Sequence, residues 1–228
     1  MSKKKIPQLA YHRGRHGLLP DGRIIKENSL LSFDAALKEG AEIIEFDVER
    51  GLRICHDPEV PPDAPSLSDV LNLVSGKCSL NVEIKCPSTV TEVCNLINKS
   101  LESGSWKPEQ FIVSSFNHSV AIECRKRLPS IKVGAIFDGV ILPEYVAILA
   151  SSGINNLHIE WRAALMDFAF GANMRDTAKK HGMSLWSYTI NQTSALDKLI
   201  EYGIDAVFTD EPLLLKTHLK SLASKIDG

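Results

Sequence analysis

Short apolar runs rich in β-branched residues alternate along this chain with segments whose apolar residues recur at helical spacing. The runs that we predict to form strands are residues 8–11, 41–48, 52–55, 80–84, 111–115, 132–137, 156–159, 184–190 and 206–209. Helical spacing is clearest for Leu30, Phe33 and Leu37, and further helices are predicted at residues 67–74, 90–101, 119–128, 144–151, 174–181, 193–202 and 213–224. Strands that alternate with helices are typical of a parallel sheet covered by helices.

The run at residues 52–55 breaks this alternation, because only Glu49, Arg50 and Gly51 separate it from the preceding strand. So short a link can form only an antiparallel hairpin, since a parallel crossover needs about a dozen residues. The remaining runs supply eight parallel strands, the number found in a (β/α)8 barrel. We therefore predict one α/β TIM-barrel domain over residues 1–228, with a short hairpin after its second strand and no sizeable insertion. An open doubly wound sheet is the alternative, and no G-x-G-x-x-G motif supports it.

The net charge of −2 provides no positive field that would attract nucleic acid. The chain has no run of about 18 uncharged apolar residues, so we expect no transmembrane segment. No apolar stretch follows the basic residues 3–5, as a secretory signal would require. The five cysteines form no C-x-x-C pair, which is typical of reduced thiols. These features predict a cytoplasmic protein without nucleic-acid partners, and they leave its oligomeric state open.

Carboxylates stand at the ends of two neighbouring predicted strands. Glu45 and Asp47 are two residues apart, so their side chains share one face of a strand, and Glu83 lies at the end of the next barrel strand. In a barrel the carboxyl ends of the strands surround one mouth. Three carboxylates gathered there repel one another unless a cation is present, and oxygen donors suit Mg²⁺ or Ca²⁺. The pattern predicts one divalent cation held by these three residues.

Two histidines and two cationic side chains accompany this acidic group. His12 ends the first predicted strand and His56 follows the predicted hairpin, on either side of the carboxylates. Because imidazole titrates near neutral pH, the two histidines can divide general-acid and general-base work. Arg13 and Lys85 can bind the oxygens of a phosphate group. The combination predicts an enzyme that cleaves phosphodiesters.

Ordered motifs extend over nearly the whole chain. They are HRG at residues 12–14, ENSLLSF at 27–33, GAEIIEFDV at 40–48, HD at 56–57, NVEIK at 81–85, SSF at 114–116, TIN at 189–191 and DAVFTDEP at 205–212. In content and order they resemble the motifs of the glycerophosphodiester phosphodiesterase family. The resemblance covers the same charged positions that the strand-end argument selects.

This resemblance implies a (β/α)8 barrel that hydrolyses a glycerophosphodiester, a small molecule, to sn-glycerol 3-phosphate and an alcohol. It implies a divalent metal on the three carboxylates and acid–base catalysis by His12 and His56, without showing which histidine is the acid. In related barrel phosphodiesterases a neighbouring substrate hydroxyl attacks phosphorus, and water opens the cyclic phosphate that results. The chain departs from the family pattern in several places. The hairpin between Asp47 and His56 is shorter, the insertion common after the HD motif is essentially absent, and the loop at residues 15–26 is longer.

Two further residues are expected to contact the substrate. Tyr188 stands where the family's WTVN motif has Trp, and we expect its side chain to line the substrate site. Glu160 lies two residues after His158 at the end of a predicted strand, so both side chains are expected to face the mouth. A structural ion pair is the alternative role for Glu160.

Other candidates have mainly structural interpretations. Asp210 is expected to cap the last helix, with Pro212 in its first turn. Trp161 and Phe168 are expected to pack within a loop, and an exposed apolar rim for a lipid-like leaving group is the alternative.

Three other functions remain open at this point. Lysophospholipids could be cleaved at the same site, in a reaction of the lysophospholipase D type. A non-catalytic barrel could bind a phosphodiester, although its catalytic set should then show a gap. An enolising enzyme would use Mg²⁺ and Lys85 as base and would leave both histidines without a role.

Overall fold

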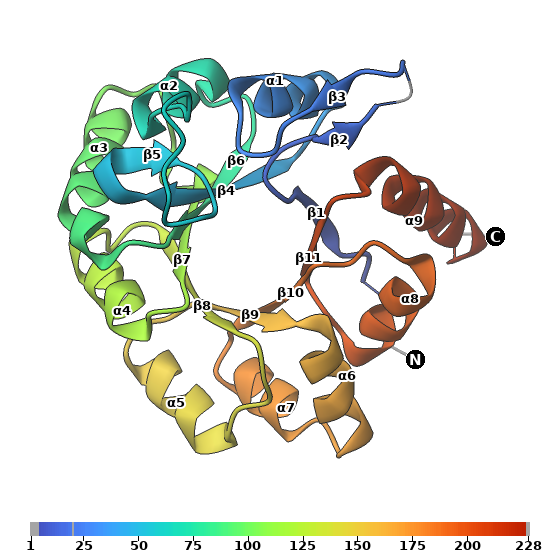
Figure 1. Ribbon diagram of the computed structural model, residues 1–228. Coiled ribbons are helices and arrows are strands. Elements are labelled where there is room, and N and C mark those ends of the chain that lie inside the picture. Colours follow the sequence, from blue (N-terminus) through green and yellow to red (C-terminus); the bar gives the residue numbers. More distant parts are fainter. Residues whose placement is uncertain (1–4, 20, 227–228) are drawn as a thin grey trace.

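Eight parallel strands close into a barrel in the computed structural model, which describes residues 5–19 and 21–226 (Figure 1). The barrel strands are β1 (Gln8–Tyr11), β4 (Ile43–Glu49), β6 (Ser79–Ile84), β7 (Phe111–Ser115), β8 (Lys132–Phe137), β9 (Asn156–Glu160), β10 (Ser184–Tyr188) and β11 (Ala206–Thr209). They are hydrogen-bonded in the order β1-β11-β10-β9-β8-β7-β6-β4, and β4 pairs again with β1. The predicted (β/α)8 class is confirmed.

Helices surround the strands on the outside of the barrel (Figure 1). They are α1 (Leu30–Lys38), α2 (Leu67–Val74), α3 (Val90–Glu102), α4 (His118–Arg127), α5 (Pro143–Ser151), α6 (Trp161–Ala169), α7 (Asn173–Lys180), α8 (Thr193–Tyr202) and α9 (Pro212–Ile226). Short 3-10 turns lie at η1 (Arg50–Leu52), η2 (Pro87–Thr89) and η3 (Pro108–Gln110). Helix α6 was not predicted, so Trp161 and Phe168 lie on a helix rather than in a loop. No helix in the described part of the chain is long and apolar enough to cross a membrane.

Strand side chains alternate between two separate apolar groups. Those that point outward join the helices in the main core, as Leu9 and Tyr11 of β1 do. The inward group is small and consists of Ala10, Ile43, Ile112, Trp186, Ala206 and Phe208. Further along the same strands the inward positions become polar, since Glu45 and Asp47 follow Ile43 at intervals of two. The barrel interior therefore changes from packed apolar side chains to ionisable ones toward the carboxyl ends of the strands.

Two antiparallel hairpins extend the barrel at this end. In the predicted hairpin, β5 (Arg53–Ile54) pairs with β4 through Val48 and Ile54, and Gly51 turns with a φ of 69°. The second hairpin was not predicted: β2 (Gly17–Leu18) pairs with β3 (Ile24–Ile25) inside the segment expected to be a long loop.

Closure of the barrel depends on the first strand. β1 pairs with β11 over its full length, from Gln8 opposite Ala206 to Tyr11 opposite Thr209. Its other edge pairs with β4 through Ala10 and Tyr11. The residues that follow β1 are consequently held between the ends of β4 and β11.

Candidate active site

The three predicted metal ligands meet at the mouth of the barrel. The parallel register of β4 and β6 places Asp47 opposite Glu83, and Glu45 lies one inward position below. One carboxylate oxygen from each residue lies within 4.8 Å of the others. Burial and the charges of Asp47 and Glu83 raise the pKa of Glu45 well above its ordinary value. Burial and Asp47 likewise raise the pKa of Glu83.

Arg13 and Lys85 partly offset this negative charge. Arg13 Nε lies 3.2 Å from Asp47 Oδ2, and the Arg13 amide donates to Glu45 Oε2 at 2.9 Å. Lys85 Nζ lies 3.0 Å from Glu83 Oε1 and 3.6 Å from Asp47 Oδ1. Burial opposes the charged form of both side chains, but the neighbouring carboxylates raise the pKa of both. Both cationic groups predicted to hold a phosphate are therefore charged and lie beside the carboxylates.

The donor set fits a hard divalent cation. It consists of carboxylate oxygens alone, the ligand type that Mg²⁺ and Ca²⁺ prefer. Burial is the largest cause of the raised pKa values of Glu45 and Glu83, and repulsion by the neighbouring carboxylates adds to it despite Arg13 and Lys85. A cation at this position would relieve that repulsion.

Asn28 fixes the orientation of one of these carboxylates, and the sequence analysis gave it no role. Its buried side-chain amide donates to Asp47 Oδ2 at 2.8 Å. The backbone amide of Asn28 donates to the Arg13 carbonyl at 3.1 Å, which ties Asn28 to the segment after β1. The feature of the sequence that could have indicated Asn28 was its place in the ENSLLSF motif.

His12 is held by a carboxylate from the opposite end of the chain. His12 Nδ1 lies 2.7 Å from Asp210 Oδ1, and Asn191 Nδ2 donates to the other Asp210 oxygen at 2.8 Å. Although burial opposes it, hydrogen bonds from His12 and His16 hold the pKa of Asp210 far below its ordinary value. An ionised carboxylate only accepts, so Nδ1 carries the proton and His12 Nε2 is left facing Glu45 Oε2 at 4.0 Å. Asp210 was expected to cap the last helix; its carboxylate instead orients His12.

His16 contacts the same Asp210 oxygen. Its Nε2 lies 3.2 Å from Asp210 Oδ1, so His12, His16 and Asp210 form a second group with closely spaced ligand atoms. The hydrogen bonds of His12 and His16 to Asp210 explain why these ligand atoms lie close together. His16 is therefore a second, longer contact to the carboxylate that orients His12.

His56 approaches the same cavity from the β4–β5 hairpin. Its Nδ1 lies 2.9 Å from Asp57 Oδ1, and its side chain is partly exposed. The pair has the same histidine–carboxylate form as His12 and Asp210, but it is open to solvent. The structure thus brings both predicted catalytic histidines to one place.

These side chains surround a cavity of about 220 Å³. It is lined by His12, Arg13, Glu45, His56, Asn81, Glu83, Lys85, Phe116, Ile136, His158, Tyr188, Thr189 and Phe208. Tyr188 lies in this lining, as expected, and its hydroxyl donates to the Phe137 carbonyl at 2.7 Å. His158 also faces the cavity, where burial lowers its pKa to about 3.

Glu160 differs from its expected role. It is the N-cap of α6, and its carboxylate accepts hydrogen bonds from the amides of Arg162 at 2.8 Å and Ala163 at 3.1 Å. Arg162 Nη1 also pairs with it at 2.9 Å. Among the described residues, the cavity lining does not include Glu160. The structure therefore gives this carboxylate the alternative role, a local ion pair at a helix start.

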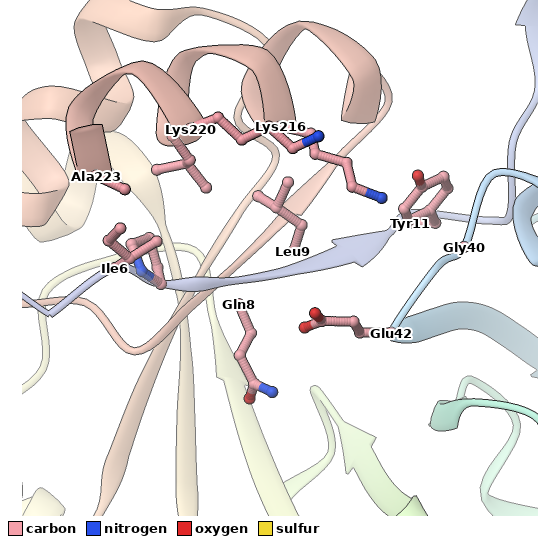
Figure 2. Close-up of a pocket in the computed structure, with 11 residues that line it drawn as sticks. Ile6, Gln8, Leu9, Tyr11, Gly40, Glu42, Lys216, Lys220 and Ala223 are labelled. Carbon is pink, nitrogen blue, oxygen red and sulfur yellow. The ribbon is translucent and has the colours of Figure 1, made fainter.

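A second hollow lies outside the barrel, between β1 and α9 (Figure 2). It measures about 210 Å³ and shares no lining residue with the cavity at the mouth. Figure 2 shows the Lys216 ammonium group pointing toward Tyr11, with Leu9 and Ile6 along the strand below α9. This hollow contains none of the candidate functional residues predicted from the sequence, most of which line the cavity at the mouth.

A parallel barrel with two histidines and two cationic side chains beside three carboxylates defines an enzyme of the phosphoric diester hydrolase class. The family model described as "Glycerophosphoryl diester phosphodiesterase family" matches residues 12–60 and 50–214. The chain belongs to this family, which confirms the resemblance seen in its motifs.

Individual relatives carry the same description. A glycerophosphodiester phosphodiesterase of Caldanaerobacter subterraneus subsp. tengcongensis is 25% identical over 240 residues, which cover 88% of this chain and 93% of that protein. One from Bacillus subtilis is 21% identical over 251 residues, covering 88% of this chain and 82% of that protein.

Solved structures confirm the fold. A phosphodiesterase of Oleispira antarctica, determined in complex with the product sn-glycerol-3-phosphate, superimposes with a TM-score of 0.76. It is 23% identical, and the match covers 94% of this chain and 97% of that chain. A Thermotoga maritima glycerophosphodiester phosphodiesterase gives a TM-score of 0.74 at 22% identity, covering 92% of this chain and 98% of that chain.

Proposed function

We propose that this chain is a metal-dependent phosphodiesterase that hydrolyses glycerophosphodiesters to sn-glycerol 3-phosphate and an alcohol. The observation that carries the proposal is the 2.7 Å contact between His12 Nδ1 and Asp210. This contact leaves His12 Nε2 facing Glu45, one of the three clustered carboxylates. A binding protein would have no need for an oriented imidazole beside three carboxylates. The product bound to the Oleispira antarctica structure is consistent with the substrate class.

Each side chain at the mouth has a role in this proposal. Glu45, Asp47 and Glu83 would hold one divalent cation, Mg²⁺ or Ca²⁺, which supplies positive charge near the phosphoryl oxygens. Arg13 and Lys85 bind the phosphate oxygens and stabilise the charge that develops on them. Tyr188 lines the substrate side of the cavity.

We assign His12 as the general base and His56 as the general acid. Asp210 stabilises the imidazolium that forms when His12 Nε2 takes a proton from the attacking hydroxyl group. His56, on the solvent-exposed hairpin, gives a proton to the oxygen of the departing alcohol. The attacking hydroxyl group is the glycerol 2-hydroxyl, so the first step forms a cyclic phosphate and breaks the bond between phosphorus and the alcohol oxygen. Water then opens this cyclic phosphate: His56 takes a proton from the water as its oxygen bonds to phosphorus, and His12 returns its proton to the glycerol 2-oxygen as the bond between that oxygen and phosphorus breaks. Both histidines are thereby restored.

Release of glycerol 3-phosphate from glycerophosphocholine tests this function. The purified chain would be assayed with EDTA, then with Mg²⁺ or Ca²⁺ added back. We expect activity that an ion restores and that His12→Ala and Glu45→Ala abolish, whereas His181→Ala, at an exposed position ending α7, leaves it unchanged. No release with any ion would exclude the proposed substrate and favour a non-catalytic barrel.

A further inference from the structure

The hollow between β1 and α9 is lined by a buried tyrosine whose hydroxyl group has no hydrogen-bond partner. Tyr11 is 2% exposed, and its hydroxyl makes no hydrogen bond within the described ranges 5–19 and 21–226. Burial and the negative charge of Glu39 raise the pKa of Tyr11 to about 12, so the hydroxyl keeps its proton and can donate. A buried donor without an acceptor is costly, because it has lost its hydrogen bonds to water. Tyr11 therefore favours a ligand that brings an acceptor into the hollow.

Glu39 does not supply that acceptor. Its Oε1 pairs with Arg15 Nε at 3.1 Å, and its buried Oε2 has no hydrogen-bond partner. The carboxylate of Glu39 also lies outside the lining of the hollow. Because Arg15 offsets the charge of Glu39, this carboxylate does not exclude an anion beside Tyr11.

Two lysines of α9 provide positive charge in the hollow. Lys216 and Lys220 are one helical turn apart, so their ammonium groups share one side of the helix and repel each other. Lys216 Nζ donates to the Glu39 carbonyl at 3.2 Å, and in the described part of the chain neither lysine forms an ion pair. Figure 2 shows Lys216 reaching toward Tyr11. An anion placed here would meet ammonium groups and a hydroxyl donor together.

The rest of the lining is mainly apolar. It includes Ile6, Pro7, Leu9, Leu219 and Ala223, which come from α9 and from the segment that leads into and forms β1. The volume of about 210 Å³ corresponds to about seven water molecules at ~30 Å³ each. The hollow therefore has room for a charged head and a short alkyl chain.

Of the described residues that line the hollow, Glu42 alone is acidic. Figure 2 shows the Glu42 carboxylate and the Gln8 amide below β1, whereas the lysines and the Tyr11 hydroxyl lie above the strand, toward α9. The strand thus separates the negative group from the positive ones. The positive groups lie on the same side of β1 as Leu9, which favours an anion with an apolar chain over a cation.

The hollow is separate from the mouth of the barrel. Leu9 and Tyr11 point outward from β1 into the main core, whereas Ala10 and His12 point into the barrel. The two cavities share no lining residue. A ligand between β1 and α9 would consequently leave the place of a substrate free.

We propose that the hollow between β1 and α9 is a second binding site, which takes a small amphiphilic anion. The carboxylate or phosphate head of the ligand accepts hydrogen bonds from Tyr11, Lys216 and Lys220, and its short alkyl chain lies against Leu9 and Leu219. This site does not depend on the proposed phosphodiesterase function, since none of its residues contributes to the mouth.

Chemical-shift titrations of the full, ion-loaded and isotope-labelled chain test the proposal, with and without saturating sn-glycerol 3-phosphate at the mouth. The ligands are hexanoate, hexyl phosphate and hexanamide. The two anions distinguish a carboxylate head from a phosphate head, and hexanamide keeps the alkyl chain without the charge. The variants are Tyr11→Phe and Lys216→Met. Lys180→Met, at an exposed position in the last turn of α7, is the matched control for the loss of one positive charge.

We expect at least one of the two anions to bind with a Kd of about 1 mM or lower, and hexanamide to bind about tenfold more weakly. Tyr11→Phe and Lys216→Met should each weaken binding of that anion by about tenfold, because each variant removes a hydrogen bond that involves a charged group. Lys180→Met should bind it as the wild type does, and glycerol 3-phosphate should leave its Kd unchanged.

The Tm of Tyr11→Phe without ligand should equal or exceed that of the wild type, since the hydroxyl that is lost has no partner. A lower Tm would show that the chain itself satisfies the hydroxyl, and it would contradict the site. The proposal is also wrong if neither anion binds, if hexanamide binds equally well, if glycerol 3-phosphate displaces the anion, or if both variants retain wild-type affinity.

Discussion

Asp210 and His12 lie 198 residues apart in the chain and form the shortest histidine contact at the mouth, at 2.7 Å. The sequence indicates His12 because it ends a strand beside acidic residues. It does not indicate Asp210, because the pattern Thr-Asp-Glu-Pro before an apolar helix is also typical of a helix cap. Only closure of the barrel by β1 and β11 brings the two side chains together. The residue that orients His12 across the closing strands was accordingly missed, whereas the grouping of the three carboxylates on neighbouring strands was predicted.

Replacing Asp210 with Asn tests its effect on His12. The substitution keeps the shape of the side chain but removes the charge that favours the Nδ1-protonated form and the imidazolium. We expect kcat to fall by about 10²-fold or more, with a much smaller change in KM. His16→Asn should have a weaker effect, since its contact to Asp210 is 3.2 Å. Equal losses in the two variants, or a loss confined to KM, would contradict an orienting role.

Glu45→Gln tests the metal site without an activity assay. A glutamine can still accept the hydrogen bond from the Arg13 amide, and it removes one of three repelling carboxylates. In EDTA we therefore expect the Tm of the variant to equal or exceed that of the wild type. An ion at a hundred times its Kd should stabilise the wild type by about 2.7 kcal/mol.

Thermal unfolding in EDTA, Mg²⁺ and Ca²⁺ measures this difference, and the variant should lose most of the ion-dependent rise in Tm. Glu42→Gln, an exposed position just before β4, is the matched control and should retain that rise. An undiminished rise in Glu45→Gln would place the ion elsewhere.

At the scale of elements, spacing in the sequence predicted the barrel strands and most helices because burial against the sheet imposes a clear period. It failed for two kinds of element. β2 and β3 have two residues each, too few for any period to be visible. Helix α6 starts directly after β9, where the Glu160 carboxylate accepts from the first helical amides. That carboxylate was interpreted as a substrate contact, so the helix start was overlooked.

Gly14 and Gly17 offer a matched test of how the segment after β1 packs. Both have positive φ, 81° and 80°, but a Cβ on Gly14 would lie 2.8 Å from the Ser32 carbonyl carbon, whereas nothing lies within 4 Å of one on Gly17. We expect Gly17→Ala to lower the free energy of unfolding by about 1 kcal/mol through backbone strain. Gly14→Ala should lower it by about 3 kcal/mol, since overpacking against α1 is added. Urea unfolding measures both values, and equal losses would contradict the close packing.

At the scale of the whole molecule, a buried histidine, His158, packs against the inward apolar group of the barrel. His158 stacks on Trp186 with ring centroids 5.1 Å apart and is 1% exposed. Burial lowers its pKa to about 3. The folded barrel therefore excludes a proton that the unfolded chain binds below about pH 6.5. Stability contributed by the neutral ring is complete above pH 6.5 and is lost as the pH falls toward 3.

The free energy of unfolding at pH 7 and pH 5 tests this dependence. We expect the wild type to lose about 2 kcal/mol more than His158→Gln over this interval, at 1.36 kcal/mol for each unit below 6.5. Absolute stabilities of the two proteins need not agree, because the readout is the difference in slope. Identical slopes would show that His158 takes up its proton in the folded state as well.

The pairing of β1 also sets the order in which the molecule can be completed during synthesis. β1 is synthesised before β11, and until β11 follows, the ladder available to β1 is the short one with β4. His12 is translated 198 residues before Asp210, the carboxylate that orients it. A nascent chain that lacks β11 therefore carries both histidines and all three acidic residues without the Asp210 contact that orients His12. The group of side chains at the mouth is therefore complete only after β11 has been synthesised.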